Sequence, residues 1–326
     1  MNPSVRSRLW GSGVSFALGF AVAYYGILVV AKPDLWLWIA VASVFMITGA
    51  LGVLFADTSS RFSVWTMVGL EVLAIFAVTP FAWMASLALT PTGITPHTIL
   101  RHDATLANIK VVWHSTDFRH SIANTVVVAG ASTLIAVVLA VFAAYAIVRL
   151  NFRGKRAAYA LVIGSLFLPM VALVGPMAGQ AFSFGLYDTK RTLVVCYLAL
   201  TLPLALWLFV SLFQRIPWSL LASAKADGAN RRQLVRRVYL PVVGPGFLAA
   251  VGIVFLVACN DLVIGLALGS SRTTLPVPAT LATFGAGFDN PTSATAAAGL
   301  IWFAPALLFV LVFQRRIVWL LGRPTP

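Results

Sequence analysis

The sequence predicts an all-α polytopic membrane protein with eight spanning helices: a core of six and an N-terminal transmembrane hairpin. Hydrophobic residues make up 60% of its 326 residues and charged residues only 10%. A soluble domain is nearer half apolar and a quarter charged. The apolar residues are gathered into runs of bilayer length, about 20 residues each. With only two cysteines, the chain is also not a disulfide-stapled secreted domain.

The first two apolar runs, Gly13–Ala31 and Leu35–Ala56, follow each other closely and predict the hairpin, within an N-terminal part of residues 1–63. A signal peptide is the alternative for the first run, but the run is long and no clear small-x-small cleavage site directly precedes Lys32. Residues 64–326 then form the core. Its six predicted spans are Val64–Leu89, Ile122–Val148, Ala157–Phe182, Thr192–Phe213, Val242–Leu268 and Ala294–Leu320.

The distribution of basic residues predicts the orientation in the membrane. The formal net charge is +14, and 16 of the 23 Lys and Arg residues fall in segments on the side of the N-terminus. Cytoplasmic loops carry such an excess, so we expect both termini in the cytoplasm. A nucleic-acid-binding protein would gather its basic residues into a soluble patch, whereas these flank apolar runs. We therefore expect membrane lipid and no nucleic acid among the partners.

The segment 216–241 is a charged island between two long apolar runs. Pro217 suits the first turn of a helix, because its missing N–H has no intrahelical partner there. Gly228 permits a sharp turn, and Pro241 interrupts the pattern again. The pattern predicts a helix–turn–helix that lies against the membrane and offers a cationic surface to a soluble partner. The alternative is a cytoplasmic loop whose arginines only set the topology.

The spacing in this loop resembles the signature of ABC-importer permease subunits, Glu-Ala-Ala, three residues, Gly, nine residues, Ile-x-Leu-Pro. Here the register gives Ala222-Ser223-Ala224, Gly228 and Val238-Tyr239-Leu240-Pro241. Asp227-Gly228-Ala229 resembles the carbohydrate-uptake, maltose-type branch, and similarity extends from about Trp65 to Leu320. The sequence departs from the family at Ala222, where the signature has Glu, and at Ser223, where it has Ala.

The resemblance implies a type I ABC-importer permease in the bacterial cytoplasmic membrane, transporting a carbohydrate or related polyol by alternating access. It implies four kinds of partner: a second homologous permease subunit, two ATPase subunits, an extracytoplasmic substrate-binding protein and membrane lipid. The helices of residues 217–237 would dock on the ATPase, and we therefore call residues 216–241 the coupling loop. The residues assigned to this coupling are Ala222, Ser223, Ala224, Lys225, Asp227, Gly228, Ala229, Arg231, Arg232, Leu240 and Pro241.

The chain has no phosphate-binding loop of its own. Gly154-Lys155 is its one Gly-Lys pair, but it lacks the earlier glycine and has Arg156 in place of Ser or Thr. We therefore expect no enzyme activity and no bound cofactor or metal, with ATP used by the partner ATPase subunits. The histidines could suggest a metal site, but their spacing matches no compact ligand motif, which favours a polar loop facing the binding protein. They are His97, His102, His114 and His120.

Polar residues inside the predicted spans are expensive and are functional candidates. Asn260 and Asp261 are assigned to the translocation pathway, with a helix-packing hydrogen bond as the alternative. Glu71 could pair with a neighbouring helix instead. Two other functions remain open: an ion-coupled secondary transporter or channel, which should carry more paired intramembrane charges, and a non-transporting scaffold, suggested only by the lost signature Glu.

Overall fold

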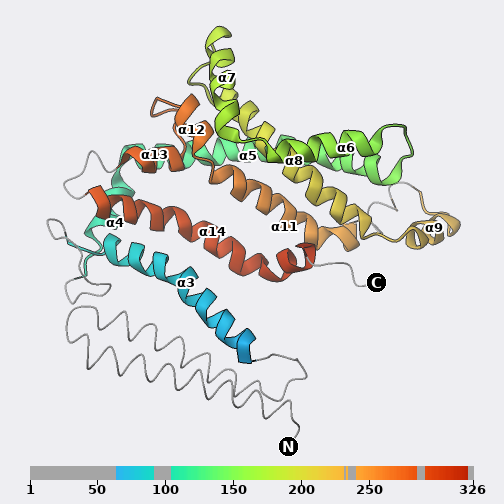
Figure 1. The fold of residues 1–326 in the computed structure, drawn as a ribbon, viewed down its shortest axis with the longest axis horizontal. Helices are drawn as coiled ribbons and strands as arrows, with labels where there is room; N and C mark the ends of the chain where they lie inside the picture. The colour runs from blue at the N-terminus through green and yellow to red at the C-terminus, as the bar shows by residue number, and fades with distance from the viewer. Residues whose placement is uncertain (1–63, 92–103, 231–232, 234–239, 285–290, 322–326) are drawn as a thin grey trace, which may run out of the picture. The chain divides into compact units, whose positions relative to one another are not determined.

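The computed structural model describes residues 64–91, 104–230, 233, 240–284 and 291–321 (Figure 1). The regular elements in these residues are helices, as predicted. The predicted hairpin, residues 13–56, lies outside them. The chain divides into two compact units, Met1–Trp113 with Phe284–Ile301, and His114–Thr283 with Trp302–Pro326.

The first unit contains α3 (Val64–Ala88), α4 (Ala107–His114) and the beginning of α14 (Pro291–Leu321). The last carbonyls of a helix have no intrahelical partners. Here the Asn108 side chain supplies a partner: its Nδ2 donates to the carbonyls of Ala88 at 2.9 Å and Thr90 at 2.7 Å. The C-terminal end of α3 is therefore tied to α4.

The second unit is built on α5 (Thr116–Arg149), α8 (Lys190–Gln214) and α11 (Leu240–Cys259), which pack on one another (Figure 1). The buried stripe of α5 is rich in small side chains, and toward its C-terminal end Ala136, Ala140 and Ala144 are fully buried at a four-residue spacing. Small side chains let helix backbones approach closely. Larger side chains of α8, including Phe209 and Leu212, fill the space opposite.

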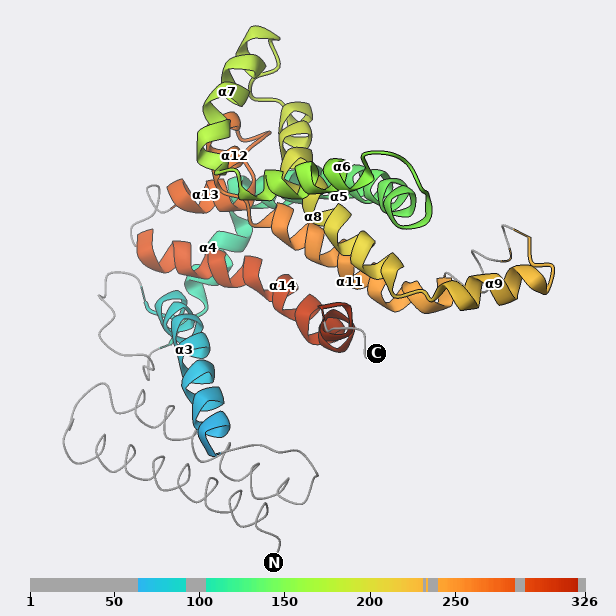
Figure 2. The same cartoon turned by 45° about the vertical axis from the view of Figure 1, so that its right-hand side comes forward.

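Three described helices are long and apolar enough to cross a membrane: Thr116–Arg149, Lys190–Gln214 and Thr292–Gln314. They agree with three of the predicted spans. The predicted span Ala157–Phe182 is not one straight helix. Its residues form α6 (Lys155–Gly164), a short 3-10 helix at Ser165–Phe167 and α7 (Met170–Ser183), bent by 96° at the break (Figure 2).

Proline explains the position of that bend. Pro169 has no N–H to continue the helix and disfavours a helical conformation in the residue before it. Leu168 is extended, with ψ 129°. The predicted span Val242–Leu268 is also not continuous. It divides into α11 and α12 (Val263–Leu268), with α13 (Val277–Phe284) following.

Candidate functional site

The first functional candidate is α9 (Trp218–Ala226) and the turn that ends it. Gly228 has a left-handed backbone, with φ +77°, and the Ala229 N–H reaches back to the Ala224 carbonyl at 3.0 Å. This is the long bond of a Schellman motif, which satisfies a helix carbonyl that would otherwise lack a partner. The turn predicted at Gly228 is therefore present, and glycine suits it because it has no Cβ to strain.

The end of α9 has a packed face and an exposed face. Ala224 and Ala229 pack against the core of α5, α8 and α11. Ala222, Ser223 and Asp227 are exposed. Figure 2 shows α9 beyond the adjoining ends of α8 and α11. The turn is thus fixed to the bundle, while the signature position at Ala222 is open to a partner.

A second helix start follows the turn. The Asn230 N–H donates to Gln233 Oε1, and the Gln233 N–H donates to Asn230 Oδ1, both at 2.9 Å. This reciprocal pair is a capping box. Lys225 lies within α9, whereas Leu240 and Pro241 begin α11, where proline is tolerated. Arg231 and Arg232 lie outside the described residues.

Arg149 joins two helix ends at the entrance to the coupling loop. It is the last residue of α5, and its Nη2 donates to the carbonyls of Phe213 at 3.2 Å and Ile216 at 3.0 Å. A guanidinium can satisfy terminal helix carbonyls and also interacts favourably with the negative end of the helix dipole. The residues immediately before α9 are therefore held by α5.

Asn260 and Asp261, the pathway candidates, lie at the break between α11 and α12. Asn260 Nδ2 donates to the Leu256 carbonyl at 2.8 Å, and Asp261 Oδ2 accepts from the Ile264 N–H at 2.9 Å. Tyr197 of α8 donates its hydroxyl hydrogen to the Asp261 carbonyl at 3.4 Å. These bonds cap both helix ends and make the break part of the fold. A role in translocation stays a prediction.

The second candidate is the 269–277 segment, which joins α12 to α13. Asp188, in the loop between α7 and α8, holds one side of it. Its Oδ1 accepts from the N–H groups of Ser270 at 2.8 Å and Ser271 at 3.1 Å, and from the Thr274 hydroxyl. Among the described residues other than glycine, Asp188 is the one with a left-handed backbone, at φ +57°. Burial alone would raise the pKa of Asp188, but these hydrogen bonds to the carboxylate outweigh that effect and lower the pKa to about 2.

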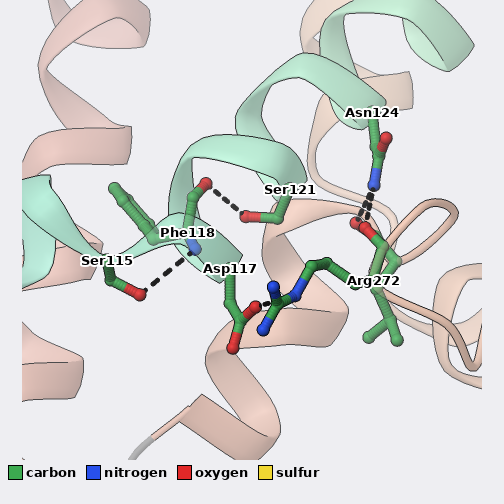
Figure 3. Close-up of polar contacts among 7 residues, drawn as sticks. Ser115, Asp117, Phe118, Ser121, Asn124 and Arg272 are labelled. Atoms are coloured by element: carbon green, nitrogen blue, oxygen red, sulfur yellow. Dashed lines mark hydrogen bonds and ion pairs between the residues drawn. The ribbon is translucent and has the colours of Figure 1, made fainter.

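Residues near the beginning of α5 hold the other side of the 269–277 segment (Figure 3). Asn124 Nδ2 donates to the carbonyls of Arg272 at 3.0 Å and Leu275 at 3.1 Å. Thr125 Oγ1 accepts from the Val277 N–H at 2.7 Å. Asp117 forms an ion pair with Arg272, but both side chains are more than half exposed, so this pair adds little. The buried amide and hydroxyl are the stronger contacts.

A family model settles the class of protein to which the chain belongs. The model for the inner membrane component of binding-protein-dependent transport systems matches residues 136–319, which include the coupling loop. The chain belongs to this family. The resemblance inferred from the coupling loop is therefore confirmed, as is the prediction of a transport component rather than an enzyme.

Individual permeases are similar over most of this chain. The trehalose transport system permease protein SugB of Mycobacterium tuberculosis is 35% identical over 265 residues, covering 79% of this chain and 95% of that protein. The trehalose/maltose transport system permease protein MalG of Thermococcus litoralis is 30% identical over 257 residues, covering 77% and 92%. The chain thus spans nearly the full length of both relatives, which are permeases of sugar transport systems.

Solved structures show that this permease shares their fold. A bacterial ABC transporter involved in the import of the acidic polysaccharide alginate contains a chain that matches with a TM-score of 0.59 at 20% identity. The match covers 77% of this permease and 96% of that chain.

Sequence reasoning found the turn of this permease but missed the contacts around it. Asn124, Arg149 and Asp188 were not among the residues assigned to coupling or to the translocation pathway. Nothing in their local spacing indicates partners as distant in sequence as Arg272. Among the described residues, no group of three His, Cys, Asp or Glu side chains is arranged to hold a metal.

Proposed function

We propose that this permease is the membrane-spanning subunit of an ATP-driven, binding-protein-dependent importer of a carbohydrate or related polyol. The substrate class is supported by the two relatives named for trehalose and maltose transport. The inner-membrane location follows from the family, and the excess of basic residues supports a cytoplasmic position for both termini.

The proposed complex contains a second homologous permease subunit, two ATPase subunits and an extracytoplasmic substrate-binding protein. This chain binds no cofactor, and ATP is used by the ATPase subunits. Their binding and hydrolysis of ATP would turn the substrate cavity alternately outward and inward. Such alternating access requires a mechanical connection between the soluble ATPase and the membrane helices.

The observation that carries the proposal is the arrangement of the α9 turn. Ala224 and Ala229 pack on the bundle, while Ala222, Ser223 and Asp227 are exposed. A docking element must present one face to its partner and transmit displacement through the other. The Schellman bond and the left-handed Gly228 keep these two faces in a fixed relation.

Uptake by the reconstituted complex tests this function. The permease, its partner permease and ATPase subunits would be placed in proteoliposomes with the loaded binding protein outside and ATP inside. We expect accumulation of labelled sugar only with ATP, and no uptake driven by a sodium or proton gradient alone. Gradient-driven uptake without ATP would favour an ion-coupled transporter. A complex that takes up none of the ligands that its binding protein retains would favour a scaffold.

A further inference from the structure

We infer that α5 is a rigid connecting rod between the coupling loop and the 269–277 segment, with Arg149 and the Asn124–Thr125 pair as its positioning residues. This inference rests on the proposed coupling role of α9. It adds a specific route by which a displacement at the ATPase side reaches a segment at the other end of the same helix.

The C-terminal end of α5 is hydrogen-bonded to the residues that lead into the coupling loop. Arg149 bonds to the carbonyls of Phe213 and Ile216, and Ile216 is only 2% exposed. Two hydrogen bonds from one charged group fix both distance and direction better than a single contact. Any shift of Ile216, two residues before α9, must therefore carry Arg149 with it or break these bonds.

The other end grips the 269–277 segment. Asn124 is 2% exposed and Thr125 is fully buried, and together they bond to the backbone of Arg272, Leu275 and Val277. Breaking these hydrogen bonds costs free energy, because water does not reach a buried amide or hydroxyl to replace the lost partner. The segment should therefore follow the α5 end rather than slide over it.

Between these grips α5 has no proline. It runs for 34 residues, and Asn124 lies 25 positions before Arg149, about 37 Å along the helix axis. The helices α3, α7, α8 and α14 each contain an internal proline, at Pro80, Pro176, Pro203 and Pro305. A proline removes a backbone bond and permits a kink. An uninterrupted helix transmits an axial shift over its length without bending there.

The competing route is α8, which leads directly into the coupling loop and starts beside Asp188. Asp188 also bonds to the 269–277 segment, through Ser270 and Thr274. However, Pro203 lies near the middle of α8 and removes one of its backbone hydrogen bonds. Double variants can separate the two routes. If α5 transmits the shift, the effect of changing Arg149 should depend on Thr125; if α8 transmits it, the effect should not.

The test reads the 269–277 segment directly. A cysteine at exposed Thr273 would carry an environment-sensitive fluorophore in the reconstituted complex, and both native cysteines are buried. ATP binding should change the fluorescence. Arg149→Met, which removes the donor of both bonds to the Phe213 and Ile216 carbonyls, and Thr125→Val, which keeps the shape but removes the acceptor, should each reduce this change about fivefold or more. The exposed Arg156→Met is the matched charge control and should leave it unchanged.

Double variants identify the route. If α5 is the rod, Arg149→Met with Thr125→Val should be no worse than either single change, because each breaks the same connection. Arg149→Met with Asp188→Asn should be additive. Co-purification of the ATPase and unstimulated ATP hydrolysis should be retained throughout, which excludes misfolding as the cause.

Two results would count against the proposals in different ways. An unchanged signal in both single variants, with the signal lost in Gly228→Val, would overturn the rod and leave the coupling role of α9 intact. An unchanged signal in Gly228→Val itself would remove the coupling role on which the rod depends.

Discussion

Substitution of Gly228 tests the α9 turn through its backbone alone. The residue has φ +77°, and a Cβ added there would meet no atom within 4 Å. Steric clash therefore contributes nothing, and the penalty is that of a left-handed backbone, about 1–2 kcal/mol for an ordinary residue. Such a penalty reduces the population of the observed turn by about 5- to 30-fold relative to alternatives.

The assay is ATP hydrolysis stimulated by the loaded binding protein, with uptake measured in parallel. Gly228→Asn should lose least, because asparagine tolerates the left-handed region. Gly228→Ala should lose about 5- to 30-fold if only the observed turn couples, and β-branched Gly228→Val should lose most. Asparagine and valine are similar in size, so bulk predicts similar losses for the two variants. Backbone preference predicts a smaller loss for asparagine than for valine.

Gly164 provides the control. It is a glycine with open space around its Cβ position but an ordinary helical backbone, at φ −56°. Gly164→Ala should leave stimulated hydrolysis unchanged. Full stimulation in Gly228→Val, or equal losses in the asparagine and valine variants, would refute the argument that the left-handed turn is needed.

Four further predictions concern other parts of the permease. Ala222→Glu restores the signature carboxylate at an exposed position and should strengthen ATPase binding by up to about tenfold, near 1.4 kcal/mol, as measured by co-purification titration; weaker binding would contradict this. Cysteines at Asn230 and Thr273 should react with impermeant reagent from opposite sides of the membrane, and labelling from one side would overturn the topology. Asp188→Asn should lower the melting temperature at neutral pH. Because the pKa of Asp188 is lowered to about 2, its carboxylate stabilises the fold fully above about pH 4. The difference in melting temperature between the variant and wild type should therefore shrink as the pH falls toward 2. Deleting Met1–Arg61 should leave measurable uptake, and an assembled but wholly inactive complex would contradict a peripheral hairpin.

The sequence allowed prediction of those features that depend on local spacing. Hydrophobic runs gave three spans that agree with Thr116–Arg149, Lys190–Gln214 and Thr292–Gln314, because length and hydropathy are properties of the run itself. The turn at Gly228 was predictable for the same reason, since glycine is the residue that a left-handed turn requires.

Features that depend on backbone breaks or distant partners were not predictable. A continuous apolar run does not reveal whether proline kinks a helix or redirects it, and at Pro169 the chain turns by 96°. Asp261 was assigned to the translocation pathway because charges are rare in apolar runs, and the sequence did not indicate that its carboxylate also caps α12. The bonds of Asn124 and Arg149 join residues more than 60 positions apart, which a single sequence does not indicate.

Site-specific crosslinking from α9 tests the central claim most directly. A photo-crosslinker attached to a cysteine at exposed Ser223 should join the permease to an ATPase subunit in the assembled complex, and nucleotide should change the yield. The same reagent at exposed Ser183, at the end of α7, should give no ATPase product. An ATPase crosslink from Ser183 with none from Ser223 would contradict the assignment of α9 as the coupling element.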